Sequence, residues 1–340
     1  MSGGERAPTD PVGSRPSAET PAVEAPRGPV SEALAPEVDA ARIEDLLVRT
    51  SRTFALAIPL LPEPTCHEVT VGYLLFRIAD TFEDASVHWE REQRQRALGE
   101  FAELLRQPSP RAAADLVPGW TEPPPSEHDG YVELVADTPL VVAAFLALAP
   151  AARETIARHT VRTAERMASF VERADARGNL RLEDLDDLRA YCYAVAGIVG
   201  EMLTELFVLG SPELQGSRQF LSERAAEFGE GLQLVNILKD SASDATEGRF
   251  YLPADVRRSQ IFALARHDLG RAAEYVLELQ ENGGPDGVVA FTALPVELAR
   301  ATLDRVEKRG PGAKLTRPEV FTIHDRVHGA IAKKRPALPR

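Results

Sequence analysis

Three carboxylates lie within five residues of one another in the segment RIADTFEDAS, residues 77–86. Asp80, Glu83 and Asp84 belong to an otherwise apolar run that begins at Val69, so a helix suited to burial carries negative charge. Like charges spaced i,i+4 cost roughly 0.2–0.5 kcal/mol per pair on an exposed helix, and burying them unpaired costs far more. Either this face is solvated, or something positive lies against it.

A second segment, GLQLVNILKDSASD, has the same character. Helical spacing of three or four residues places polar side chains on one face of each segment. The first face carries Tyr73, Arg77, Asp80 and Asp84, with Glu83 beside them, and the second carries Gln233, Asn236, Asp240 and Asp244. Carboxylates supply the oxygen ligands that Mg²⁺ prefers, and Mg²⁺ commonly bridges to substrate phosphates. Two such faces across a cavity would hold Mg²⁺ around a diphosphate; the alternative for either face alone is a solvated surface.

Basic residues near these faces fit the same chemistry. Arg52, Arg77 and Arg249 carry guanidinium groups, which suit bidentate contact with phosphate, and Lys239 precedes Asp240. Taken one at a time, each is more often a surface or ion-pair residue than a phosphate contact.

The segment YCYAVAGIVGEMLTELFVLG, residues 191–210, alternates small and bulky apolar residues. Small residues allow close helix packing or leave room for an apolar ligand, and the aromatic rings of Tyr191 and Tyr193 could stabilise a carbocation. Glu201 and Glu205 interrupt this segment, so a buried core helix is expected rather than a membrane span.

Composition narrows the class of protein. The chain has 340 residues and a net charge of −13, which argues against a general nucleic-acid binder. Its two cysteines show no disulfide or metal spacing, so we expect a reducing, cytoplasmic setting. The histidines show no zinc spacing, and no Gly-rich dinucleotide fingerprint is present.

After Asp39, the pattern along the chain is helical. Residues 1–38, rich in Pro, Ala, Glu, Ser and Gly, predict a disordered tail, and residues 39–338 predict a single all-α domain of roughly ten helices. A Pro-rich surface loop is expected at residues 116–130, and alternating strand patterns are absent.

Four segments in this order resemble the squalene/phytoene synthase family, the head-to-head trans-isoprenyl diphosphate synthases: SRTF, YLLFRIADTFED, YCYAVAGIVGEMLTELF and LQLVNILKDSASDATEGRFYLP. The resemblance runs from residue 51 to residue 253. It implies the all-α isoprenoid-synthase fold, with two aspartate-rich helices facing each other across a central cavity. The implied substrate is an isoprenoid diphosphate, farnesyl or geranylgeranyl diphosphate, and the implied metal is Mg²⁺, with Mn²⁺ as the alternative.

The resemblance also implies roles for individual residues. Asp80 and Asp84 match the first DxxxD motif and Asp240 and Asp244 the second, so these four and Glu83 are the expected metal ligands. Tyr191 matches a tyrosine near the cationic centre. The expected substrate contacts are Arg52, Phe54, Tyr73, Arg77, Gln233, Asn236, Lys239 and Arg249.

Within the family, the segment AFTALPVELARATLDRV, residues 290–306, resembles squalene synthases. The basic loop that follows implies NADPH binding by Lys308, Lys314 and Arg317. GRFYLP resembles phytoene synthases equally well, so phytoene synthesis from two geranylgeranyl diphosphates stays the alternative. Peripheral membrane contact is consistent with a hydrocarbon product, and we expect a monomer without a membrane span.

Two departures from the family pattern keep a further alternative open. Ser243 stands where the second motif usually has an acid, and Lys239 stands where an arginine usually precedes it. Loss of a carboxylate would weaken metal binding, which leaves a non-catalytic assembly or lipid-binding factor of the same fold as a third interpretation.

Overall fold

The computed structural model describes residues 39–51, 54–175 and 178–339. The predicted disordered tail, residues 1–38, and the predicted substrate contact Arg52 therefore lie outside the described residues.

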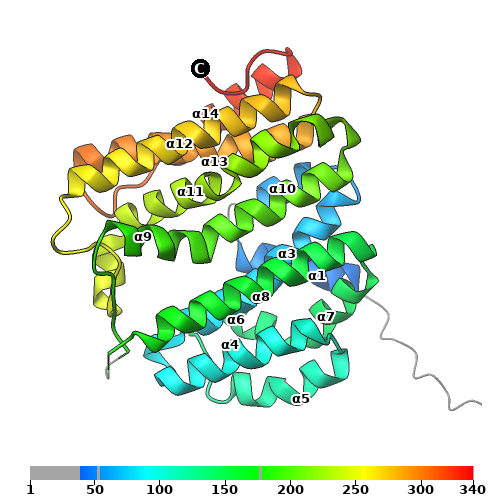
Figure 1. Ribbon diagram of the computed structural model, residues 1–340, viewed down its shortest axis with the longest axis vertical. Helices are drawn as coiled ribbons and strands as arrows, with labels where there is room; N and C mark the ends of the chain where they lie inside the picture. Colours follow the sequence, from blue (N-terminus) through cyan, green and yellow to red (C-terminus); the bar gives the residue numbers. More distant parts are fainter. Residues whose placement is uncertain (1–38, 52–53, 176–177, 340) are drawn as a thin grey trace, which may run out of the picture. The chain divides into compact units, whose positions relative to one another are not determined.

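The described residues are almost entirely helical (Figure 1), as the sequence predicted. The α-helices are α1 (Ala40–Thr50), α2 (Phe54–Ala57), α3 (Thr65–Asp84), α4 (Arg91–Arg106), α5 (Pro110–Thr121), α6 (Asp129–Ala136), α7 (Thr138–Ala147), α8 (Pro150–Glu172), α9 (Leu185–Cys192), α10 (Ile198–Gly210), α11 (Arg218–Thr246), α12 (Arg258–Glu281), α13 (Asp286–Arg309) and α14 (Arg317–Ala332). Short 3-10 turns are η1 (Ile58–Leu60), η2 (Ala85–Val87) and η4 (Pro212–Ser217), and η3 (Tyr193–Gly197) is a π-helix.

Two helices hold the acidic faces predicted from the sequence. The first face lies on α3, which packs against α1, α7, α8 and α10. The second lies on α11, which runs between α10 and α12 (Figure 1). Buried apolar side chains form one core around α3 and a second around the C-terminal half of α11, and burial of this apolar surface is the main stabilising contribution.

A two-residue parallel pair positions the chain after α11. β1 (Leu180–Arg181) pairs with β2 (Arg249–Phe250), so Leu180 lies opposite Arg249. Gly248, with φ +78°, makes the turn into β2, and a Cβ there would lie 2.2 Å from Oδ1 of Asn179. The pair directs Arg249 and the residues after it back toward α11.

The prediction of a surface loop at residues 116–130 was wrong for residues 116–121. Helix α5 extends to Thr121 with Pro118 inside it. Trp120 is buried, its indole NH donates to Glu100 at 2.8 Å, and its ring lies 5.1 Å from that of Phe82. Burying this aromatic side chain outweighs the helix-breaking tendency of proline.

The segment Leu185–Gly210 is long and apolar enough to cross a membrane by composition. In the structure it is an unbroken helical stretch, α9–η3–α10, and 61% of its most apolar window is buried by other helices. That burial is typical of a core helix.

Helix α11 approaches both η3 and α10 unusually closely at two glycines. A Cβ on Gly229 would lie 2.0 Å from the carbonyl oxygen of Ala196, and one on Gly200 would lie 1.9 Å from that of Ala225. Close packing, one of the two interpretations of these small residues, is therefore confirmed for Gly200.

We expect Gly229→Ala to lower the free energy of unfolding by ~1–3 kcal/mol, because backbone must move to admit the methyl group. Gly270→Ala on α12 is the matched control, because no atom would lie within 4 Å of a Cβ added there. Alanine at this position should raise the free energy of unfolding by ~0.5–1 kcal/mol. Urea denaturation measures both. Equal effects of the two substitutions would contradict the close approach.

Candidate active site

A cavity of about 630 Å³ separates α3 from α11, within the range usual for small-molecule sites. Its polar part is lined by most of the predicted residues: Tyr73, Arg77, Asp80, Glu83, Asp84, Tyr191, Gln233, Asn236, Lys239, Asp240, Asp244 and Arg249. Phe54, also predicted, lies on its apolar wall. The structure thus brings together residues that are up to 195 positions apart, from Phe54 to Arg249.

The first acidic face is a compact group of ligand atoms. Carboxylate oxygens of Asp80, Glu83 and Asp84 all lie within 4.8 Å of one another. Burial raises the pKa of Asp80, and burial together with the charge of Asp84 raises the pKa of Glu83 to about 8. Arg77 pairs with Asp80, so the group is partly neutralised within α3 itself.

The second acidic face is more open. Asp240 is 38% exposed and forms an ion pair with Lys239 at 3.2 Å. Asp244 is only 16% exposed, and burial raises its pKa to about 6. Lys239 also donates to the amide oxygen of Asn236 at 3.2 Å, so the neutral and charged members of this face contact one another.

Arg249 is the positive charge between the two faces. Its guanidinium lies 3.4 Å from a carboxylate oxygen of Asp84 on α3 and 3.5 Å from one of Asp244 on α11. It also pairs with Glu247 at 2.7 Å. A guanidinium placed between two carboxylate groups and open to the cavity is suited to contact a diphosphate.

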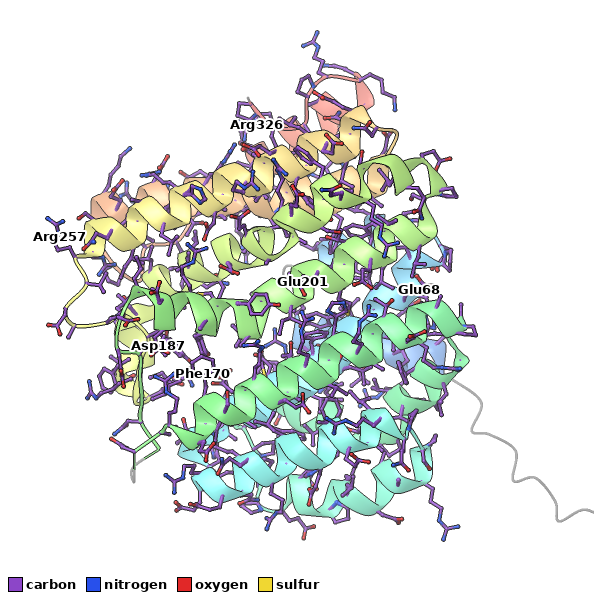
Figure 2. All side chains as sticks on the ribbon, viewed as in Figure 1. Glu68, Phe170, Asp187, Glu201, Arg257 and Arg326 are labelled. Atoms are coloured by element: carbon purple, nitrogen blue, oxygen red, sulfur yellow. The ribbon has the colours of Figure 1, made fainter. Side chains whose placement is uncertain are left out.

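Tyr191 and Tyr251 form a buried hydroxyl pair beside Glu83. The Tyr191 hydroxyl donates to that of Tyr251 at 2.8 Å and lies 3.5 Å from Oε1 of Glu83, and the two rings stack at 4.6 Å. Burial raises the pKa of both hydroxyls, so both are neutral at pH 7. Phe170 (labelled in Figure 2) packs edge-on against Tyr191 and fixes its ring.

Two tyrosines of the cavity were missed by the sequence reasoning. Tyr251 follows Arg249 by two positions, and the alternation of an extended strand could have placed both on one side. Tyr131 on α6 had no comparable signal. Its ring lies 5.4 Å from the guanidinium of Arg77, which lies 5.6 Å from the ring of Tyr73 on α3.

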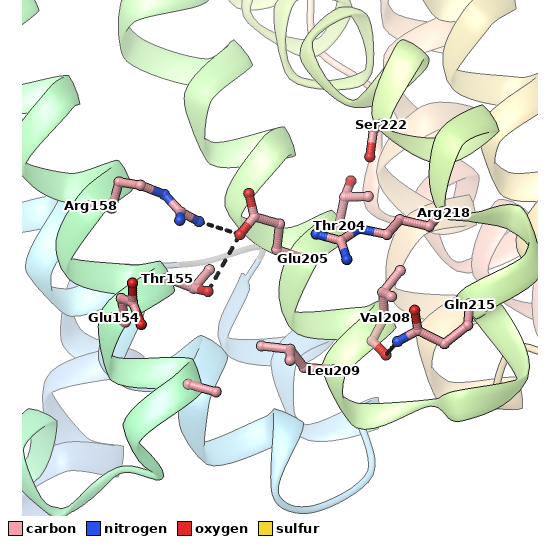
Figure 3. A pocket seen from close by; sticks show the side chains of 11 residues that line it. Glu154, Thr155, Arg158, Thr204, Glu205, Val208, Leu209, Gln215, Arg218 and Ser222 are labelled. Atoms are coloured by element: carbon pink, nitrogen blue, oxygen red, sulfur yellow. Dashed lines mark hydrogen bonds and ion pairs between the residues drawn. The ribbon is translucent and has the colours of Figure 1, made fainter.

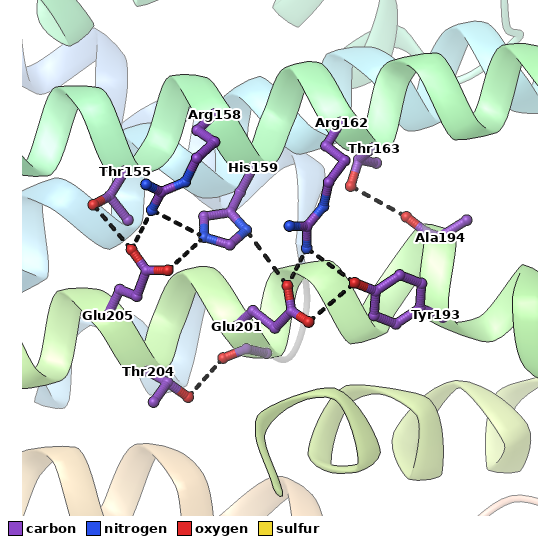
Figure 4. A network of polar contacts seen from close by, with 11 residues as sticks. Thr155, Arg158, His159, Arg162, Thr163, Tyr193, Ala194, Glu201, Thr204 and Glu205 are labelled. Carbon is purple, nitrogen blue, oxygen red and sulfur yellow. Dashed lines mark hydrogen bonds and ion pairs between the residues drawn. The ribbon is translucent and has the colours of Figure 1, made fainter. Parts of the chain in front are cut away.

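Behind the cavity wall, a polar network joins α8 to α10 (Figure 4). His159 is 2% exposed and bonds to Glu205 at 3.1 Å, and Arg162 contacts both Glu201 and the hydroxyl of Tyr193. The network fixes the π-helix η3 to α8, and the Tyr193 hydroxyl is engaged in it through hydrogen bonds with Arg162 and Glu201. The neighbouring Tyr191 is therefore the tyrosine of this helix that serves the cavity.

A smaller cavity of about 200 Å³ lies between α8, α10 and the start of α11 (Figure 3). The ion pair of Arg158 with Glu205 forms one side of it. Its lining contains none of the described residues that the sequence singled out for chemistry.

Glu230 on α11 is a buried carboxyl that the cavity does not use. Burial and the charge of Asp268 raise its pKa from 4.5 to about 7. The folded protein therefore binds more protons than the unfolded chain between about pH 4.5 and pH 7, and stability falls as the pH rises through this window.

We expect Glu230→Gln to remove this loss, so that the variant exceeds the wild type in unfolding free energy by ~1–3 kcal/mol at pH 8 but not at pH 4.5. Denaturation across this range tests it. Glu223→Gln, at a carboxylate 56% exposed on the same helix, is the control and should show no such difference. A gain for Glu230→Gln that does not change with pH would contradict the assignment.

The remaining predicted residues that the structure describes do not line the cavity. Ser243 is exposed and its hydroxyl donates to the carbonyl of Asp240 at 2.8 Å, so the departure from the family pattern falls outside the lining. Lys308 in the last turn of α13, Lys314 in the loop that follows and Arg317 at the start of α14 are all exposed. The amide of Gly312 in this loop donates to the carbonyl of Lys239 at 2.7 Å, which places the loop beside the second acidic face.

The donor set of the two faces fits Mg²⁺. It consists of hard carboxylate oxygens, three of which converge on α3 while Asp240 and Asp244 lie across the cavity. Burial is the main cause of the raised pKa values of Glu83 and Asp244, and the charges of the neighbouring carboxylates Asp84 and Asp240 add to it.

Sequence comparison finds related proteins. The squalene/phytoene synthase family pattern matches residues 47–322. The chain is 30% identical over 220 residues to squalene synthase of Schizosaccharomyces pombe, covering 63% of this chain and 44% of that protein. It is 28% identical over 327 residues to squalene synthase of Mycosarcoma maydis, covering 83% and 52%. The chain thus spans about half the length of these relatives.

Structural comparison gives the same fold. The complex of TcSQS with the ligand E5700 has a TM-score of 0.67 at 24% identity, covering 86% of this chain and 88% of that one. A dehydrosqualene synthase in complex with ligand has a TM-score of 0.55 at 20% identity, covering 86% and 96%. The predicted all-α isoprenoid-synthase fold is confirmed.

Proposed function

This chain belongs to the squalene/phytoene synthase family, and from that membership we propose that it is a Mg²⁺-dependent squalene synthase. It would join two farnesyl diphosphates head to head through presqualene diphosphate and then reduce that intermediate to squalene with NADPH. The proposal rests on one observation: two acidic helix faces, on α3 and α11, lie opposite each other across one cavity that also has an apolar wall.

The polar end of the cavity would bind the diphosphates. Asp80, Glu83, Asp84, Asp240 and Asp244 would hold Mg²⁺, which when bound supplies Lewis-acid stabilisation of the leaving diphosphate. Arg77, Lys239 and Arg249 offer cationic donors to the same group, and Gln233 and Asn236 offer neutral ones.

The apolar end would bind the prenyl chains and exclude water. Phe54, Val199, Leu203 and Phe291 are among its lining residues, and an allylic cation formed beside them would not be quenched as an alcohol. Its attack by the double bond of the second farnesyl diphosphate forms the new carbon–carbon bond. The Tyr191 hydroxyl, hydrogen-bonded to Tyr251, would then assist loss of the proton as the cyclopropane closes.

The reductive half needs a hydride, which NADPH would supply. We assign its binding to Lys308, Lys314 and Arg317, and the contact of Gly312 with Lys239 supports a loop beside the cavity. We further propose a cytoplasmic monomer with peripheral contact to the inner membrane, because squalene partitions into lipid.

Product analysis by gas chromatography–mass spectrometry tests the proposal. Purified protein receives farnesyl or geranylgeranyl diphosphate with Mg²⁺, with and without NADPH, and Asp80→Asn serves as the inactive control. Squalene formed only from farnesyl diphosphate with NADPH is the expected result. Phytoene from the C20 substrate, independent of NADPH, would instead identify a phytoene synthase. Failure to release diphosphate from either substrate would favour a non-catalytic factor, although the position of Ser243 outside the cavity argues against that interpretation.

A further inference from the structure

Arg94 is a buried arginine directly behind the first acidic face. It lies on α4, is 3% exposed, and one of its Nη groups donates to the main-chain carbonyl of Glu83 in the last turn of α3. Arginine is almost never this buried unless it is paired. Its Nε and its other Nη have no hydrogen-bond partner among the described residues.

Leaving guanidinium donors unpaired in a core costs free energy, so packing alone does not account for an arginine here. The last turn of a helix has free carbonyl groups and a partial negative charge, and a cation stabilises it. In α3 that same turn carries Glu83 and Asp84, so the cation at Arg94 acts on the segment that holds the acidic group.

Position distinguishes Arg94 from the other cations near this face. Arg77 and Arg249 line the cavity and are therefore accessible to an anionic substrate. Arg94 does not line the cavity, and its contact is with the backbone of α3 rather than with a carboxylate oxygen. Its hydrogen bond can persist whatever the cavity holds.

We propose that Arg94 is a positioning residue for the first acidic face: by holding the Glu83 carbonyl it fixes the last turn of α3 and so places the Glu83 and Asp84 carboxylates for metal binding. The inference rests on the proposed function, because it assumes that these carboxylates bind a metal with a diphosphate. Groups that orient metal ligands from outside are commonly worth ~10–100-fold in metal affinity.

The test is a titration with Mn²⁺ in the presence of inorganic diphosphate. Electron paramagnetic resonance measures the bound Mn²⁺ at a temperature well below that of unfolding. Arg94→Met removes the donor and the charge but keeps an elongated apolar side chain, and we expect it to weaken Mn²⁺ binding by ~10–100-fold. Arg94→Lys keeps a charge and one donor group and should lose less. Arg96→Met, on the exposed side of α4, changes the net charge equally and should bind like the wild type.

A second readout separates positioning from a structural role. In steady-state kinetics, Arg94→Lys should need more Mg²⁺ for half-maximal rate, while KM for the prenyl diphosphate at saturating Mg²⁺ stays unchanged. If Arg94→Met does not fold, the Arg94→Lys titration decides. If the wild type binds Mn²⁺ and both Arg94 variants bind it equally tightly, this inference is overturned and the proposed function is not. Absence of Mn²⁺ binding by the wild type would overturn the proposed function and this inference with it.

Discussion

Replacing Asp80 with asparagine should lower kcat/KM for diphosphate release by at least ~10²-fold, the effect typical of losing one group that stabilises developing charge. Asp80 is the carboxylate of the first acidic face that pairs with Arg77, and both side chains line the cavity. The amide keeps the shape of the side chain and one acceptor oxygen, but it lacks the charge that attracts Mg²⁺ and that forms the ion pair with Arg77. The measurement is a coupled assay of diphosphate release as a function of Mg²⁺ concentration.

The matched control is Asp325→Asn, at a carboxylate that is 79% exposed on α14, which should leave the rate unchanged. Thermal unfolding of both variants shows whether the fold is preserved. An Asp80→Asn protein that folds and keeps wild-type kcat/KM would contradict the assignment of the first acidic face as the metal site.

Replacing Tyr191 with phenylalanine should give the second large effect, a fall of ~10²-fold or more in the rate of cyclopropane formation, as for loss of a general acid or base. The Tyr191 hydroxyl is positioned by Tyr251 at 2.8 Å and lies 3.5 Å from Glu83. Phenylalanine keeps the ring stacked on Tyr251 and against Phe170, so binding of the prenyl chain should change little. Presqualene diphosphate formed in a single turnover without NADPH measures this step.

The hydrogen bond between the two hydroxyls predicts that their contributions are not additive. In a double-mutant cycle, Tyr251→Phe should cost much less in the Tyr191→Phe background than in the wild type. Tyr275→Phe is the control, because its buried hydroxyl bonds to Thr204 at 2.9 Å away from the cavity lining, and it should change stability but not rate. Additive effects of Tyr191→Phe and Tyr251→Phe would show that the two hydroxyls act separately.

The helices and their acidic faces could be predicted because their signals are local. The spacing from Tyr73 to Asp84 and from Gln233 to Asp244 follows from the geometry of one α-helix, and both sets line the cavity as a face should. Local signals failed where distant packing decided the outcome. Pro118 indicated a loop, but burial of Trp120 against Phe82 keeps Pro118 within helix α5.

The sequence by itself determined the helical class, the family and the residue types of the two acidic faces, because periodicity and motif spacing are properties of short segments. Only the tertiary structure decided that Arg249 lies between the two faces, that Tyr251 bonds to Tyr191, and that Arg94 supports Glu83 from α4. It also decided the π-helix η3, which no sequence pattern indicated and which begins at Tyr193. These contacts join residues as far as 165 positions apart, from Asp84 to Arg249, and are set by packing between helices that no local rule describes.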